Sequence, residues 1–268
     1  PVYVMPNSFG PFKGIGVEWL VRRVMNKCEI VAVRESISKE MVDKIGVKTI
    51  LMPDLGFALS KSSSQYPEIE QIKDSNPDKK LVAITARPYR FPNSNNPEEK
   101  YKEYIDNMVL FSKWLFENGY LPIFVDHTLS NTTHESDFSC IQEIVSKLND
   151  HEYLIISNED YNCKDLKAIY GKFDYVIGTR FHSVIFALSE NIPSLAITYG
   201  GNKGQGIMRD LGLSEYAIPM SELKVDRAIQ SFTILVENEE QVRNVLKKNK
   251  EYVEQKHTEL VNIIKETL

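Results

Sequence analysis

The sequence has few of the features that define several common classes of protein. Its three cysteines, Cys28, Cys140 and Cys163, are odd in number and far apart, and no Cys-x-x-Cys pair occurs. This spacing argues against a disulfide framework or a zinc site and favours a reducing, cytosolic setting. No apolar run approaches the roughly 18 residues that span a bilayer, and no signal-peptide pattern opens the chain. We therefore predict a cytoplasmic protein without a transmembrane segment, which can still visit a membrane surface.

A cluster of positive charge is also absent. The formal net charge is -5, and no clustered basic stripe occurs along the 268 residues. Nucleic-acid binding through phosphate neutralisation is therefore not expected, although a local basic pocket remains compatible with this charge. His, Asp and Glu do not cluster at metal-ligand spacing, so no metal is predicted. The length favours one or two domains of α/β size.

Short apolar strands alternate with helical stretches from one end of the chain to the other. Residues 2–5, 30–33 and 49–51 are strand-like, with helical patterns between them, which is a βαβαβ signature. A second series of strands is predicted at residues 81–85, 121–125, 153–156, 175–177 and 195–198. A long charged amphipathic helix over residues 239–265 follows. The pattern predicts an α/β protein with parallel sheets.

A polar stretch rich in serine and proline at residues 61–79 interrupts this alternation and reads as an interdomain linker. The chain opens at Pro1 already inside a predicted sheet, so we expect the first domain to be incomplete. The predicted order is the remaining part of an N-terminal Rossmann-like domain, a linker, a C-terminal Rossmann-like domain and a C-terminal helix, over residues 1–60, 61–79, 80–235 and 236–268. A cleft is expected between the two domains.

Residues 174–188 join a buried strand, a turn and a helix start, and they form the most informative segment. The turn places Arg180 and His182 beyond the carboxyl end of a strand, where ligands bind in open α/β sheets. The N–H groups that open the next helix attract phosphate or carboxylate, and Arg offers a planar fork to the same groups. We interpret the turn as an anion site. The alternative is a surface ion pair for Arg180 and a structural role for His182.

Four separated segments resemble the polysaccharide pyruvyl transferase family: residues 6–12, 32–36, 53–58 and 174–213. The last segment includes Gly178-Thr179-Arg180-Phe181-His182 and the loop at residues 199–203. The resemblance implies a GT-B-like fold of two Rossmann-type domains. It also implies transfer of a pyruvyl group from phosphoenolpyruvate to a sugar hydroxyl pair, commonly as a cyclic ketal. The acceptor would be a saccharide or a lipid-linked saccharide, met in the cytoplasm or at the inner membrane face, and no cofactor is implied.

The predicted donor site contains the residues that could bind the carboxylate and phosphate of phosphoenolpyruvate: Arg180, Phe181, His182, Arg87 and Lys203. His182 is the predicted general acid that protonates the methylene carbon, with Arg180 beside it. Arg87 follows a strand, and Pro88 turns the chain into a loop there. Lys203 lies in a predicted glycine-rich loop. A solvated strand-end Arg and a mobile surface loop are the alternatives for these two positions.

The predicted acceptor site contains Asn7, Ser8, Asp54 and Arg34, which follow strands of the first domain. Asn7 and Ser8 would bind sugar hydroxyls, and Asp54 would accept a proton from one of them. Asp54 as a turn cap and Arg34 in a local pair with Glu35 are the structural alternatives. Residues 90–99 have loop composition and are predicted to cover the acceptor.

Two other functions fit the same pattern. The first is a GT-B glycosyltransferase with a nucleotide-sugar donor, in which Arg180 and Lys203 would hold a diphosphate. Its discriminating feature is a pocket for base and ribose, and no acidic residue is clearly placed for a ribose. The second is a non-catalytic or incomplete partner subunit, which would expose an apolar patch where a further segment packs.

Overall fold

The structure, a computed structural model, describes residues 1–130, 132 and 135–268. It contains two parallel sheets, which confirms the predicted α/β class. The first sheet has the order β1-β2-β3 and the second the order β6-β5-β4-β7-β8-β9. The strands are β1 Tyr3–Asn7, β2 Ile30–Val33, β3 Ile50–Leu51, β4 Lys80–Thr85, β5 Tyr120–Val125, β6 Leu154–Ile156, β7 Tyr175–Gly178, β8 Ser194–Thr198 and β9 Ala217–Pro219.

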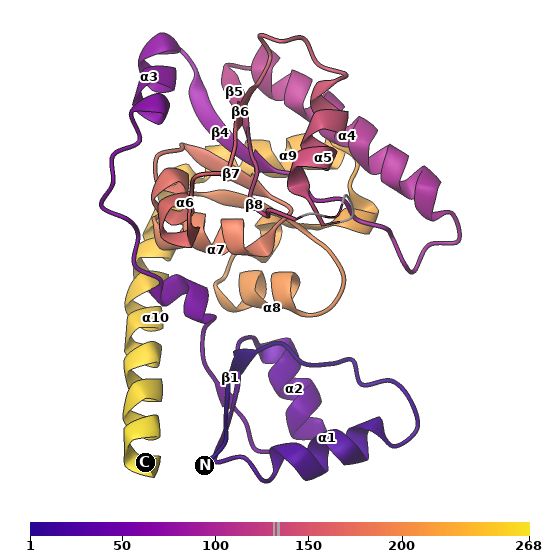
Figure 1. Cartoon of the computed structure of the whole chain (residues 1–268), viewed down its shortest axis with the longest axis vertical. Coiled ribbons are helices and arrows are strands. Elements are labelled where there is room, and N and C mark those ends of the chain that lie inside the picture. Colours follow the sequence, from indigo (N-terminus) through magenta and orange to yellow (C-terminus); the bar gives the residue numbers. More distant parts are fainter. Residues whose placement is uncertain (131, 133–134) are drawn as a thin grey trace. The chain divides into compact units, whose positions relative to one another are not determined.

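Helices connect these strands along the chain (Figure 1). They are α1 Val17–Met25, α2 Ser36–Lys44, α3 Pro67–Ser75, α4 Pro97–Glu117, α5 Asp137–Val145, α6 Cys163–Tyr170, α7 Phe181–Ser189, α8 Lys203–Asp210, α9 Val225–Glu237 and α10 Glu239–Thr267, with 3-10 turns at Leu55–Ala58, Ser214–Tyr216 and Met220–Glu222. Local sequence explains several helix starts. Asn162 and Asp165 form a capping box at α6, and a proline occupies the first turn of α3 and of α4.

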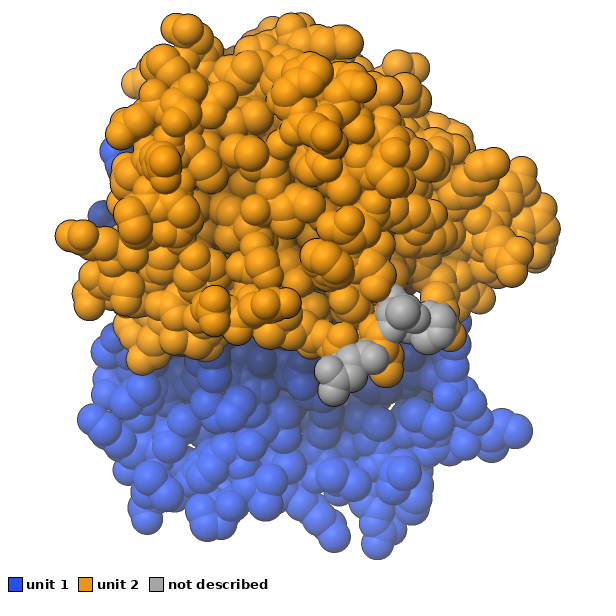
Figure 2. Space-filling model, turned by 45° about the horizontal axis from the view of Figure 1, so that its top comes forward, with its two compact units in different colours: residues 1–59, 200–214, 244–268 blue, residues 60–199, 215–243 orange. Residues whose placement is uncertain are grey.

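The chain divides into two compact units, coloured blue and orange in Figure 2. Unit 1 contains Pro1–Leu59, Gly200–Ser214 and Asn244–Leu268, and unit 2 contains Ser60–Tyr199 and Glu215–Arg243. Three separate segments of the sequence therefore build unit 1. The segment predicted as a linker contains α3 and belongs to unit 2, and α8 belongs to unit 1 although strands of unit 2 flank it in sequence.

Unit 2 is a doubly wound sheet with helices on both faces. Helices α4, α5 and α9 pack together on one face, and α6 and α7 lie on the other (Figure 1). The strands β7 and β8 are buried along their whole length, as continuous apolar runs in parallel sheets are. The connections bring the carboxyl ends of β4 and β7 side by side, because these strands pair in register from Val82 and Tyr175 to Thr85 and Gly178.

Unit 1 has a smaller parallel sheet with its own core. Met25, Val31, Val33 and Val42 pack on one face, and Ile30, Ala32, Met52 and Leu260 pack together in a second cluster. Leu260 comes from α10, so the last helix contributes to the core that the first strands build. Within the residues that the structure describes, no helix has the length and apolar character needed to cross a membrane.

One local prediction is wrong. The sequence pattern around Lys203 predicts a glycine-rich loop, but Lys203 is the first residue of α8, and two glycines lie inside this helix. The packing of Gly206 explains why this helix contains glycine. A side-chain carbon at this position would collide with the side chain of Glu35, so α8 uses glycine to approach the start of α2. Close packing outweighs the low helix propensity of glycine here.

Candidate functional site

Polar residues of unit 1 gather where all three of its strands end. Ser8 follows β1, Arg34 and Glu35 follow β2, and Asp54 lies beyond β3. The carboxyl ends of parallel strands meet at one edge of a sheet, which is the edge where open α/β sheets bind ligands. The backbone amide of Arg34 donates to the carbonyl of Asn7 at 3.1 Å, which fixes the first two strand ends to each other.

Arg34 is the centre of this group. Its Nε donates to Ser8 Oγ at 2.7 Å, and its Nη1 donates to Asp54 Oδ2 at 2.8 Å. The exposed fractions of the Arg34 and Asp54 side chains are 14% and 7%, so the ion pair is largely shielded from water. Asp54 also accepts from the amide of Gly56, which orients the carboxylate. The structure therefore brings together three of the four residues of the predicted acceptor site.

Lys203 joins the same group from α8. Its Nζ lies 3.9 Å from Asp54 Oδ2, and its side chain is 23% exposed. Burial, together with the charge of Arg34, lowers the pKa of Lys203 to about 8, although Asp54 and Glu35 oppose this shift. The sequence placed Lys203 with the donor-site residues of the second domain. In the structure its described neighbours are the predicted acceptor residues of unit 1.

Glu35 is a member of this group that the sequence analysis did not select. It is fully buried, accepts from Ser8 Oγ at 3.2 Å, and caps α2 by accepting from the amide of Ser38. Burial raises the pKa of Glu35, and hydrogen bonds from Ser38 and Ser8 oppose the rise. In the sequence, its position directly after Arg34 and before a helix could have identified it as a site residue. Asn7, in contrast, is exposed, and its Oδ1 accepts from the amide of Ser8.

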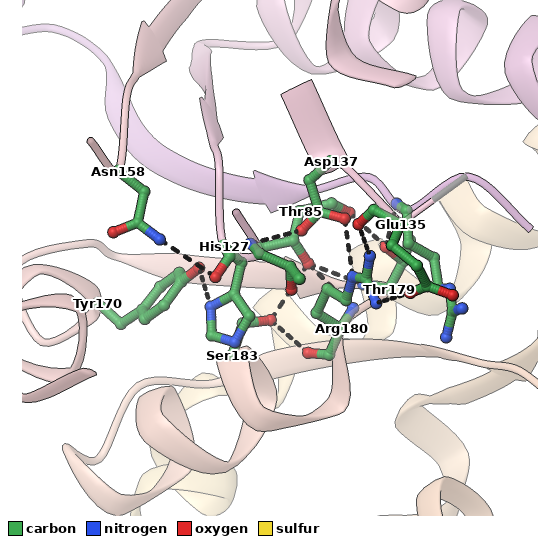
Figure 3. A network of polar contacts seen from close by, with 11 residues as sticks. Thr85, His127, Glu135, Asp137, Asn158, Tyr170, Thr179, Arg180 and Ser183 are labelled. Carbon is green, nitrogen blue, oxygen red and sulfur yellow. Dashed lines mark hydrogen bonds and ion pairs between the residues drawn. The ribbon is translucent and has the colours of Figure 1, made fainter. Parts of the chain in front are cut away.

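A second polar group lies in unit 2 at the ends of β4 and β7 (Figure 3). Thr85 Oγ1 accepts from the amides of Thr179 and Arg180 at 3.0 and 3.2 Å. Thr179 Oγ1 in turn donates to the carbonyl of Thr85 and accepts from the amide of Arg87. These bonds tie the two strand ends together and hold the turn that contains the predicted Arg-Phe-His motif.

Within this motif, Arg180 points into the protein. Its Nε donates to Asp137 Oδ1 at 2.7 Å and its Nη2 donates to the carbonyl of Glu135 at 2.6 Å (Figure 3). Asp137 is fully buried, and burial raises its pKa to about 7 although Arg180 opposes the rise. Arg180 is 9% exposed. The guanidinium therefore anchors the beginning of α5, and Asp137 is a partner that the sequence did not reveal.

The two residues after Arg180 take opposite positions on the first turn of α7. Phe181 is buried and His182 is exposed. The side chain of Phe181, a residue of the predicted donor site, packs in the interior of unit 2, and the imidazole of His182 is on its surface. His182 is therefore not buried with the guanidinium of Arg180, its neighbour in the motif.

Arg87 packs against aromatic rings beyond the end of β4. Its guanidinium carbon lies 3.8 Å from the centre of the Tyr199 ring and 5.7 Å from that of Tyr89. The Nε atom of Arg87 is buried and has no hydrogen bond within the described residues. Stacking on Tyr199 replaces solvent on one face of the guanidinium. No group of three His, Cys, Asp or Glu in the described part of the chain is arranged to hold a metal ion.

Solved structures similar to this chain define the class of fold. HepE from Anabaena, solved in complex with UDP and glucose, superposes with a TM-score of 0.58 over 95% of this chain and 67% of HepE, at 12% identity. UDP-GlcNAc 2-epimerase from Neisseria meningitidis, solved bound to UDP-GlcNAc, superposes with a TM-score of 0.62 over 99% of this chain and 69% of the epimerase, also at 12% identity. The chain therefore has a GT-B-like fold, as predicted.

The sequence identifies the family within this class. The model of the polysaccharide pyruvyl transferase family matches residues 1–201, and the chain belongs to this family. It is also 25% identical over 248 residues to AmsJ, an amylovoran biosynthesis protein of Erwinia amylovora. That alignment covers 90% of this chain and 59% of AmsJ, so the chain spans about three fifths of the relative's length. The family match confirms the predicted family.

Proposed function

We propose that this chain transfers a pyruvyl group from phosphoenolpyruvate to a pair of hydroxyls on a sugar of a surface polysaccharide or its precursor. Family membership supports the reaction class. The structural observation that carries the proposal is the pairing of two cations, Arg34 and Lys203, with the shielded carboxylate of Asp54 in unit 1. This group combines anion binding with a proton acceptor at the ligand-binding edge of a parallel sheet.

The two cations suit the two anionic groups of the donor. Phosphoenolpyruvate has a carboxylate and a phosphate on one carbon atom, and Arg binds either group through a planar fork. Lys203 has a lowered pKa because it is partly buried beside a second cation. The bound trianion would relieve this repulsion and keep Lys203 protonated. We therefore assign Arg34 and Lys203 to donor binding.

The reaction needs one proton transfer to carbon and two attacks by oxygen. A proton is added to the methylene carbon of phosphoenolpyruvate, which becomes the methyl group, and positive charge develops on the central carbon. One sugar hydroxyl attacks this carbon and loses its proton, phosphate departs, and the second hydroxyl closes the ketal. The two hydroxyl protons balance the proton gained by carbon and the proton taken up on release of phosphate.

Candidate residues exist for each proton transfer. His182 is exposed on the first turn of α7, and we propose it as the acid, because histidine is the residue type best suited to general acid catalysis near neutral pH. Asp54 is proposed as the acceptor of a hydroxyl proton, with Ser8 and Asn7 contacting sugar hydroxyls. For Arg180 we propose a positioning role through Asp137, because Asp137 and Glu135 already accept its hydrogen bonds.

The acceptor is proposed to be a lipid-linked saccharide at the inner face of the membrane. Supporting this choice is the similarity to AmsJ, which is named for the biosynthesis of a polysaccharide. The direct experiment is incubation of the chain with phosphoenolpyruvate and a panel of diol-bearing oligosaccharides, followed by phosphate assay and mass spectrometry. We expect release of one phosphate per pyruvyl ketal added to the acceptor.

A matched pair of variants makes this experiment specific. Lys203→Met should lower kcat/KM by at least about 100-fold, while Lys27→Met, at an exposed cation before the amino end of β2, should lower it less than about 2-fold. Consumption of a UDP-sugar in place of phosphoenolpyruvate would contradict the proposal and support a nucleotide-sugar glycosyltransferase.

A further inference from the structure

A cavity of about 590 Å³ lies in unit 2, formed by the loop after β4, the first turns of α4 and the exposed side of α5. It belongs neither to the Arg34 group of unit 1 nor to the contacts of Arg180. Six residues supply its aromatic and polar lining: Tyr89, Arg90, Glu98, Tyr101, Ser139 and Glu143. Its volume is within the range of about 300–1,000 Å³ that is typical of small-ligand pockets.

The aromatic wall of this cavity is held in place by packing. The Tyr89 ring lies 4.9 Å from the Phe91 ring and 5.5 Å from the Tyr199 ring. Phe91 is buried and has a φ of 47°, in the left-handed region that favours glycine. Strained backbone of this kind persists where the surroundings hold it, and it is concentrated at ligand-binding segments. Phe91 thus anchors the loop that presents Tyr89 and Arg90.

The opposite wall is ordered by a hydrogen bond. Tyr101 on α4 donates its hydroxyl to Glu143 Oε2 on α5 at 2.9 Å. Burial raises the pKa of Tyr101, and Cys140 and Glu143 raise it further, so the hydroxyl stays a donor through the physiological range. The Glu143 carboxylate is thereby fixed beside the Tyr101 ring, with its second oxygen available to a ligand.

The charges of the lining exclude a strongly anionic ligand. Two carboxylates, Glu98 and Glu143, accompany one cation, Arg90, so a phosphate or diphosphate would meet net negative charge. Aromatic faces next to carboxylates and a hydroxyl suit a ligand with an apolar ring face and many hydroxyl groups. A sugar ring has this combination, because its C–H groups pack on an aromatic face while neighbouring hydroxyls donate to a carboxylate.

We propose that this cavity is a saccharide subsite that binds neutral sugar residues of the glycan on which the protein acts. The identification of the glycan as the acceptor rests on the proposed function. The recognition itself rests on Tyr89 and Tyr101 as stacking surfaces and on Glu143 as the acceptor of sugar hydroxyls. The subsite adds affinity for the glycan and takes no part in phosphoenolpyruvate binding.

The test is binding of the full chain to a printed array of neutral, uronic-acid and phosphorylated bacterial oligosaccharides. We expect binding to neutral members, and Tyr101→Ala should weaken the strongest interaction at least about 10-fold, since ring stacking is lost. Tyr101→Phe keeps the ring and removes only the bond to Glu143, so it should weaken binding only a few-fold. Phe138→Ala changes an exposed ring on α5 outside the cavity lining and should leave binding unchanged.

Two results would overturn the inference: wild-type chain that binds no glycan of the array, or binding that Tyr101→Ala and Tyr101→Phe both leave intact. Calorimetric titration with phosphoenolpyruvate on the same variants separates this inference from the proposed function. Unchanged phosphoenolpyruvate affinity in folded Tyr101→Ala is the expected result. Absence of phosphoenolpyruvate binding in the wild type, with glycan binding intact, would contradict the proposed function alone.

Discussion

Because the side chain of Lys203 is partly buried, we expect the binding of phosphoenolpyruvate to depend on pH. Its pKa is lowered from 10.5 to about 8, so the free protein loses this positive charge as pH rises through about 8. A trianionic donor binds better to the protonated form. We therefore predict that the Kd for phosphoenolpyruvate rises by about 10-fold between pH 7.5 and 9.5, a range in which the phosphate is fully ionised.

Calorimetric titrations at several pH values measure this effect. Lys203→Arg is the control, because guanidinium stays charged throughout the range, and its Kd should vary less than about 2-fold. If the wild-type Kd is as independent of pH as that of the variant, Lys203 does not supply the charge that holds the donor.

Arg180 and Asp137 form a buried ion pair, and the loss of either partner should destabilise the fold. Removal of either partner leaves the other buried without its counter-charge, which costs about 3–5 kcal/mol in comparable pairs. We predict that Asp137→Asn and Arg180→Met each lower the free energy of unfolding by about 2–4 kcal/mol, because Glu135 still contacts Arg180 in the first variant. The double variant should lose much less than the sum, as urea denaturation would show; additive losses would mean that the two side chains act independently.

The residues of the candidate site were predictable to different degrees. Ser8, Arg34 and Asp54 could be selected from the sequence because each follows a strand, and parallel strands end at a common edge. Asp137 could not be selected, since its importance depends on Arg180, 43 positions away in sequence. The grouping of Lys203 with Arg34 was missed for the same reason: no local pattern records which unit a helix packs against.

At the scale of elements, the contact between α8 and α2 is the feature on which the unit 1 site depends. Gly206 faces Glu35, and the amide of Ser36 at the start of α2 donates to Asp210 at the end of α8. This contact positions Lys203, the first residue of α8, next to Asp54. All strands except β9 and most helices followed from hydrophobic periodicity, but α8 did not, because its two glycines and short length give a weak helical signal.

The substitution Gly206→Ala tests this contact, because its effects on helix propensity and on packing oppose each other. Helix propensity alone would make alanine more stable by about 1 kcal/mol, while the collision with Glu35 should cost about 1–3 kcal/mol and displace Lys203. We predict a lower melting temperature and weaker phosphoenolpyruvate binding. Gln205→Ala, at an exposed position of α8, should change neither quantity. Gly206→Ala with wild-type stability and affinity would show that the close approach of the helices is dispensable.

At the scale of the whole molecule, the two ends of the sequence share one unit. Leu260 of α10 is 2% exposed and packs with Ile30 and Met52, so the last helix completes the core of the first strands. The amphipathic pattern of α10 was visible in the sequence, but the residues it packs against were not. Unit 1 is therefore built from segments that the predicted domain order kept apart.

Leu260→Ala should lower the free energy of unfolding by about 2–5 kcal/mol, because it leaves a cavity in this core. Val261→Ala is the matched control on the same helix, 48% exposed, and should change the free energy by less than about 0.5 kcal/mol. Urea denaturation followed by circular dichroism gives both values. Equal effects of the two substitutions would mean that α10 does not pack on the first strands in solution.

The central claim is that unit 1 binds phosphoenolpyruvate through Arg34 and Lys203. Calorimetric titration of the chain with phosphoenolpyruvate, and separately with UDP, tests it most directly. The account predicts saturable binding of phosphoenolpyruvate, weakened at least about 10-fold in Arg34→Lys, which keeps the charge but loses the planar fork, and no binding of UDP. Binding of UDP without phosphoenolpyruvate, or equal phosphoenolpyruvate affinity in wild type and variant, would contradict it.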